Sequence, residues 1–112
     1  MMCKDAATEM VAAGRSLWSA MDDELIKILA APPNASETVD EANTRKERIL
    51  GSMFGRLSVV ESRGMWLRLS RVREGDALSE TFARFPNAMR QRLIEFLVDE
   101  RRLKALGTAA RR

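Results

Sequence analysis

Residues 50–67 read LGSMFGRLSVVESRGMWL, and this stretch decides the predicted fold. Apolar positions recur in it at alternating steps of three and four, which is the heptad pattern of a helix packed along its length. Small residues form a neighbouring strip that would let another backbone approach closely. The stretch therefore predicts a helix with neighbours on two sides. The heptad series is Leu50, Met53, Leu57, Val60, Gly64 and Leu67, and the small strip is Gly51, Gly55, Ser58 and Ser62.

Outward from this stretch, the helix is expected to run over about 39–74 and to end before Gly75-Asp76, which supplies a C-terminal glycine and a new N-cap. Arg63-Gly64 is a second point where it can break, because a helical glycine costs about 1 kcal/mol relative to alanine. The sequence leaves the continuity of the helix at this point open. Two capping-box patterns compete for its start, of which we choose the earlier: Thr38-x-x-Glu41 and Thr44-x-x-Glu47.

The flanking segments also show helical spacing. A first helix is expected over about 5–31, where Pro32 stops it. A short helix over 77–85 and a final helix over 87–106 follow, separated by Pro86. Gly107 is expected to end the last helix and residues 108–112 to be disordered. The sequence therefore predicts a single all-α domain over residues 1–112, a bundle of three to four helices in which the first is antiparallel to a long central helix.

The composition argues against an enzyme. The 112 residues include no histidine, no tyrosine and one cysteine. Most metal sites and nucleophile–base pairs are built from these side chains. We therefore predict no catalytic residue, no cofactor and no metal site.

Charge is distributed unevenly along the chain. Residues 1–44 carry eight acidic and three basic side chains, whereas residues 45–112 carry sixteen basic and eight acidic ones. This asymmetry fits two interpretations, a basic surface for an anionic partner or an acidic first segment that folds back onto the basic remainder.

Nucleic acid is the anionic partner to consider first. Residues 77–105 resemble a helix–turn–helix in the order of their elements, but the interior RLIEFLV of 92–98 is too apolar for a helix exposed in a major groove. Binding would therefore use phosphate contacts rather than base reading. The candidate contacts are Arg90, Arg92, Arg101, Arg102 and Lys104.

The central helix also suggests a symmetric antiparallel dimer that crosses at Gly64-Met65. When residue numbers are paired to a sum of 129, Glu61 lies opposite Arg68 of the partner, and apolar residues lie opposite apolar ones. The alternative is that Glu61 and Arg68 are edge charges of a monomeric bundle. The predicted interface consists of Leu57, Val60, Glu61, Gly64, Met65, Arg68, Leu69 and Val72.

These observations favour a non-enzymatic, oligomerising helical adaptor or regulatory protein that acts through protein–protein contacts. The alternative is a nucleic-acid-associated protein of the small DNA-packaging or transcription-factor type, using its basic second half. Cys3 has no internal disulfide partner, and the first residues contain no long apolar run. A cytoplasmic protein without a membrane segment is therefore expected.

Overall fold

The computed structural model describes residues 20–110, and all regular elements in this part of the chain are helices. The predicted all-α bundle is confirmed, but it contains more than the three to four helices predicted, because the central helix and the final helix are each divided in two. Residues 5–19 of the expected first helix lie outside the described residues. The elements are the helical residues 20–30, called segment 20–30, followed by α2 (Val39–Gly55), α3 (Val59–Leu69), α4 (Ala77–Phe82), α5 (Asn87–Leu97) and α6 (Glu100–Ala110).

The start of α2 confirms the earlier of the two capping boxes. Thr38 has an extended backbone, its hydroxyl accepts a hydrogen bond from the Glu41 amide at 3.1 Å, and the Glu41 carboxylate accepts one from the Thr38 amide at 2.9 Å. Two backbone amides that have no partner within the helix are thereby satisfied.

The prediction of one continuous helix over 39–74 is wrong. The chain leaves the helical path at residues 56–58, and Ser58 starts α3 with a second capping box. Its hydroxyl accepts from the Glu61 amide at 3.1 Å, and the Glu61 carboxylate accepts from the Ser58 amide at 2.8 Å. Gly64, the break point considered from the sequence, lies inside α3. A hydroxyl and a carboxylate three residues apart outweigh the heptad pattern here because they satisfy the first amides of a new helix.

The second half of the chain follows the sequence signals in part. Gly75 adopts φ +86°, a left-handed conformation that favours glycine, and Asp76 then caps α4. Pro86 precedes α5 as predicted. The single final helix over 87–106 is wrong, because the chain breaks between α5 and α6. There the Asp99 carboxylate accepts a hydrogen bond from the Arg102 amide at 3.1 Å. Gly107 does not end α6, and residues 108–110, expected to be disordered, continue it.

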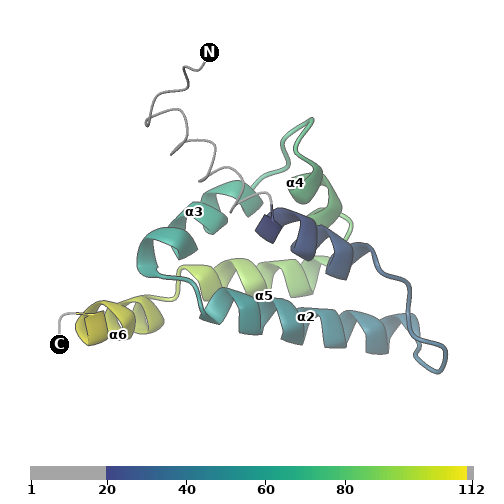
Figure 1. The fold of residues 1–112 in the computed structure, drawn as a ribbon, viewed down its shortest axis with the longest axis horizontal. Coiled ribbons are helices and arrows are strands. Elements are labelled where there is room, and N and C mark those ends of the chain that lie inside the picture. The colour runs from purple at the N-terminus through teal and green to yellow at the C-terminus, as the bar shows by residue number, and fades with distance from the viewer. Residues whose placement is uncertain (1–19, 111–112) are drawn as a thin grey trace, which may run out of the picture.

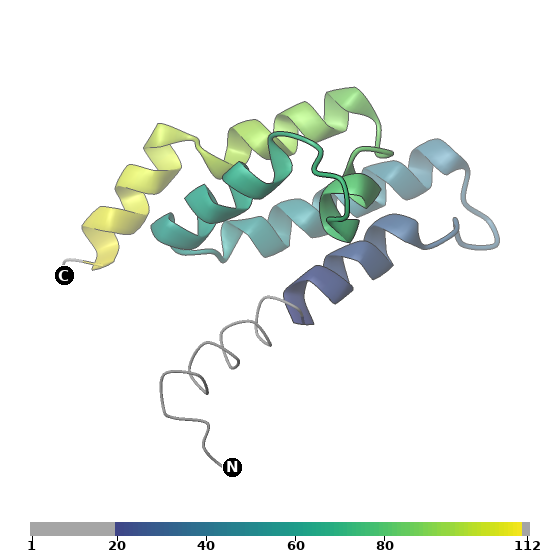
Figure 2. The ribbon, with the colours of Figure 1, turned by 90° about the horizontal axis from the view of Figure 1, so that it is seen from above.

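The described helices pack around one core, with α6 at one end of the bundle (Figures 1 and 2). Segment 20–30 and α2 run in opposite directions, as the predicted antiparallel hairpin requires, and α2 lies beside α5. In turn, α3 packs against α4, α5 and α6. The core lies between these helices and contains Leu25, Leu29, Leu50, Phe54, Leu57, Met65, Leu69, Leu78, Phe82, Phe85, Leu93 and Leu97.

A buried lysine holds the end of segment 20–30 against α2. The Lys46 ammonium donates to the carbonyl oxygens of Leu29 at 2.9 Å and Ala31 at 2.6 Å. Carbonyls at a helix C-terminus have no partner within the helix, and a cation there also matches the helix dipole. Burial lowers the pKa of Lys46 below its usual value.

Candidate interaction surface

The residues of the predicted dimer interface do not share one surface. Leu57, Met65 and Leu69 are buried in the core of their own chain. Glu61 caps α3. Val60 and Val72 are exposed, and Gly64 is half-buried. The structure therefore offers no continuous face for the pairing drawn from the sequence, and self-association of the chain stays a prediction.

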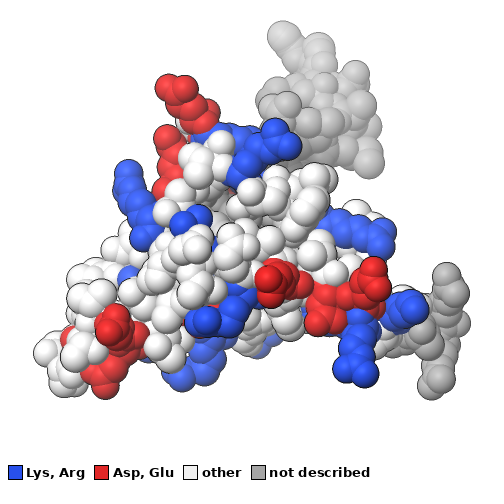
Figure 3. Space-filling model, turned by 180° about the vertical axis from the view of Figure 1, so that it is seen from behind, with Lys and Arg blue, Asp and Glu red and all other residues white. Residues whose placement is uncertain are grey.

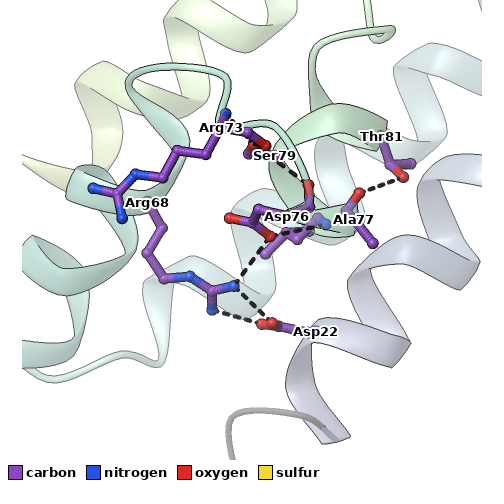
Figure 4. A network of polar contacts seen from close by, with 8 residues as sticks. Asp22, Arg68, Arg73, Asp76, Ala77, Ser79 and Thr81 are labelled. Atoms are coloured by element: carbon purple, nitrogen blue, oxygen red, sulfur yellow. Dashed lines mark hydrogen bonds and ion pairs between the residues drawn. The ribbon is translucent and has the colours of Figure 1, made fainter.

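Arg68, expected opposite Glu61 of a partner, has its acidic partner within the chain (Figure 4). Its guanidinium donates two hydrogen bonds of 2.7 Å to the Asp22 carboxylate of segment 20–30. The Asp76 carboxylate lies 3.7 Å from the same guanidinium and also accepts from the Leu78 amide of α4. The hydrogen bonds that Arg68 donates to the Asp22 carboxylate raise the pKa of Arg68. This network ties segment 20–30, α3 and α4 together.

The Asp22–Arg68 pair bears on the charge asymmetry of the chain. Asp22 belongs to the acidic first segment and Arg68 to the basic remainder. Glu37 in the loop before α2 likewise pairs with Arg45 at 2.7 Å. Part of the acidic segment therefore folds back onto the basic part, as one of the two sequence interpretations expects.

Three of the five predicted nucleic-acid contacts are engaged within the chain. Arg90 donates to the Phe85 carbonyl at 2.8 Å, and Arg92 donates two hydrogen bonds to the Glu47 carboxylate at 2.7 and 2.8 Å. Arg102 also has internal partners, whereas Arg101 and Lys104 are exposed. On the face shown in Figure 3, basic side chains are interspersed with acidic ones. Of the five residues, Arg101 and Lys104 have no hydrogen bond or ion pair among the described residues.

Arg102 anchors α6 to the rest of the bundle. Its guanidinium donates to the carbonyls of Phe96 at 3.0 Å and Leu97 at 3.2 Å, at the end of α5, and to the Ser62 hydroxyl of α3 at 2.8 Å. It also lies 4.4 Å from the centroid of the Phe96 ring, within range of a cation–π interaction. Burial lowers the pKa of Arg102, and its buried Nη1 has no acceptor among the described residues. The described contacts of Arg102 are therefore structural: they attach α6 to α3 and α5.

The outer face of α3 consists of Val60, Arg63, Gly64 and Leu67, and no other described helix covers its two apolar side chains. Val60 is 80 % exposed and Leu67 is 55 % exposed. The opposite side of the helix is buried and consists of Ser62, Met65 and Leu69. Val60 and Leu67 are seven residues apart, so they lie on one side of the helix. A Cβ atom built on Gly64 would meet nothing within 4 Å. This face is the candidate interaction surface.

The heptad series of the sequence contains this face, but the break at residues 56–58 changes its meaning. Leu50 and Leu57, before and within the break, are buried in the core. Val60 and Leu67 continue the same series after the break and point to solvent. Residues 56–58 are not helical, so the helix that follows them is rotated relative to α2. One periodic sequence pattern is therefore divided between the core and the exposed face of α3. The Ser58-x-x-Glu61 pattern is the sequence signal that predicts this shift.

Among residues 20–110, no group of three histidine, cysteine, aspartate or glutamate side chains is placed to hold a metal ion. The helices in this range are too short or too polar to cross a membrane. Comparison of the chain with protein-family models, curated proteins and solved structures gives no match. Function is therefore inferred from the residues of this chain.

Proposed function

We propose that this chain is a non-enzymatic helical adaptor or regulator that binds an acidic helix of a partner protein through the outer face of α3. The exposure of Val60 and Leu67 on one face of α3, which no other described helix covers, supports this proposal. Grouped apolar side chains on a surface are typical of protein interaction sites, and an apolar helix face is a common means of binding another helix. We expect the protein to act in the cytoplasm, because one cysteine cannot form an internal disulfide.

Gly64 adds a second reason to expect a helix as the partner. It lies between Val60 and Leu67 in the interior of α3, where glycine destabilises a helix by about 1 kcal/mol relative to alanine. No neighbour in the described chain needs the space that its missing side chain leaves. A glycine at this position lets the backbone of a bound helix approach closely.

Arg63 determines the charge expected of the partner. It lies three residues after Val60 and four before Leu67, so it is next to both on the helix surface. Arg63 is exposed and has no ion pair among the described residues. A guanidinium beside an apolar contact favours a partner that supplies a carboxylate. Two copies of this face would bring two Arg63 side chains together, which disfavours self-association through α3.

Site-specific photo-crosslinking in the full-length chain tests the proposal. A photoreactive amino acid replaces Leu67 in one variant and Val72, which is 58 % exposed outside α3, in the control. The variant at position 67 is expected to label a helix that contains Asp or Glu, and adding Val60→Asp is expected to abolish this labelling. Equal labelling from both positions, or labelling that survives Val60→Asp, contradicts the proposal. Labelling of a second copy identifies a homo-oligomer instead.

Two matched glycine substitutions separate binding from stability. Gly51 of α2 and Gly64 of α3 are both in helix interiors, and a Cβ on either would meet nothing within 4 Å. Each glycine-to-alanine change is expected to stabilise the fold by up to about 1 kcal/mol. Gly64→Ala alone is expected to weaken the crosslinked complex. Equal effects of the two changes on the complex contradict a close approach at Gly64.

The nucleic-acid alternative is tested by molar mass from light scattering at two salt concentrations, with and without duplex DNA. Arg101 and Lys104 are exposed, so replacing both with alanine leaves the fold intact. DNA binding at low salt that this double change weakens supports the alternative. The mass of the chain alone measures the predicted self-association.

A further inference from the structure

A pocket of about 440 Å³ opens where three parts of the chain meet, away from the outer face of α3. Segment 20–30 ends at it, α2 begins at it, and the turn between α4 and α5 closes its third side. Pockets of this volume are within the range that binds small molecules in proteins. The pocket therefore has the size of a ligand site, and its lining decides what ligand fits.

The lining is mostly apolar. Leu29 and Phe85 form buried walls, while Val39, the first residue of α2, lies at the pocket and is 63 % exposed. When an apolar ligand group covers this apolar surface and removes it from water, the free energy of the system falls. An aliphatic chain is the simplest group that covers Val39 while contacting Leu29 and Phe85.

The polar groups of the pocket favour an anion. Arg84 is the one charged residue in the lining, is exposed, and has no ion pair among the described residues. Asn43 also lines the pocket, and no hydrogen bond within the described chain uses its amide. Arginine and asparagine side chains donate hydrogen bonds to carboxylate oxygens, and the arginine bond is charge-assisted. No carboxylate in the lining competes for Arg84.

We infer that this pocket binds a small aliphatic monocarboxylate, with its chain against Leu29, Val39 and Phe85 and its carboxylate on Arg84 and Asn43. The lining places an apolar wall and a single cationic group in one half-open cavity, and a ligand with one apolar end and one anionic end matches both. This inference does not depend on the proposed partner of α3, because the two sites share no residue.

The inference is tested with decanoate and the full-length chain, below the micelle concentration, by two-dimensional NMR of ¹⁵N-labelled protein. Saturable shifts are expected at the Asn43 side-chain amide and at the backbone amide of Arg84. Decylammonium, which has the same chain and the opposite charge, is expected to bind at least tenfold more weakly, as is acetate, which lacks the chain. Absence of saturable shifts at Asn43 and Arg84, or equal affinity for decylammonium, overturns the inference.

Two variants complete the test. Arg84→Gln is expected to lower the affinity for decanoate about tenfold, because it removes a hydrogen bond to a charged group. Arg56→Gln, at the C-terminal end of α2, changes the net charge equally and is expected to leave the affinity unchanged. Both arginines are exposed, so both variants keep the fold. Equal affinities of the two variants would show that decanoate binds without Arg84, which also overturns the inference.

Discussion

Arg68 of α3 and Asp22 of segment 20–30 are 46 residues apart in sequence and form an ion pair with two hydrogen bonds of 2.7 Å each. Both side chains are partly buried, with exposed fractions of 26 % and 22 %. A bidentate pair between guanidinium and carboxylate constrains orientation as well as distance. This pair therefore constrains the position of segment 20–30 relative to α3.

Asp22→Asn is expected to destabilise the fold by about 1–2 kcal/mol. The estimate lies between the small contribution of exposed pairs and the larger loss on breaking fully buried ones. The Asp76 carboxylate, 3.7 Å from the Arg68 guanidinium, still partly balances the Arg68 charge in this variant. Urea denaturation of the variant and of Asp23→Asn, an exposed neighbour, measures the difference. Equal midpoints for the two variants contradict a role for Asp22 in stability.

The helix boundaries that could be predicted depend on neighbouring residues. Thr38 with Glu41 starts α2, and Asp76 starts α4, through hydrogen bonds between groups a few residues apart. Pro86 precedes α5 without a side-chain cap, and all three starts are found where the sequence places them. The break at Ser58 uses the same chemistry as the start at Thr38. The heptad pattern across this break is regular, so periodicity alone does not predict the shift in helical phase.

The candidate sites depend on contacts that the sequence does not determine. Arg68 has several acidic residues as plausible partners, and sequence pairing favours Glu61, whereas the fold brings Asp22 to it. The heptad pattern includes Val60, Gly64 and Leu67, but their exposure follows from the packing of α3. The pocket residues Asn43 and Arg84 show no sequence signal, because they meet only when α2 and the α4–α5 turn come together.

Ser58→Ala is expected to cost about 1 kcal/mol of folding free energy, because it removes the hydroxyl that accepts from the Glu61 amide. Ser58→Thr keeps a hydroxyl and is expected to recover most of this loss. Chemical denaturation of both variants provides the measurement. If Ser58→Ala and Ser58→Thr unfold at the same denaturant concentration, the cap does not contribute to stability.

Glu37 provides a pH-dependent contribution to stability. Hydrogen bonds to the Glu37 carboxylate lower its pKa from 4.5 to about 2. The larger effect comes from the Arg45 side chain and the smaller one from the Asn34 backbone amide. Because the pKa is lower in the folded state, the contribution is complete above pH 4.5 and is lost as the pH falls toward 2. An NMR titration of the Glu37 carboxyl is expected to show a midpoint near pH 2, and Arg45→Gln is expected to move it toward 4.5. An unchanged midpoint in that variant would exclude Arg45 as the main cause.

Arg102→Met is expected to release α6 while the rest of the bundle stays folded. No α6 side chain described by the structure joins the core, so the hydrogen bonds from Arg102 to Ser62, Phe96 and Leu97 are its principal attachment. Hydrogen bonds to charged groups contribute about 1.5–3 kcal/mol each, but the buried Nη1 without an acceptor offsets part of this.

A net loss of about 2 kcal/mol at this attachment corresponds to roughly thirtyfold faster amide exchange in α6. Amides of α2 and α5, which surround the core, are expected to change much less. The control is Arg101→Met, because Arg101 is adjacent, exposed and outside the network. Hydrogen exchange measured by NMR distinguishes the helices. Equal exchange in α6 for the two variants, or equal acceleration in α2 and α6 for Arg102→Met, contradicts the assignment of Arg102 as the anchor of α6.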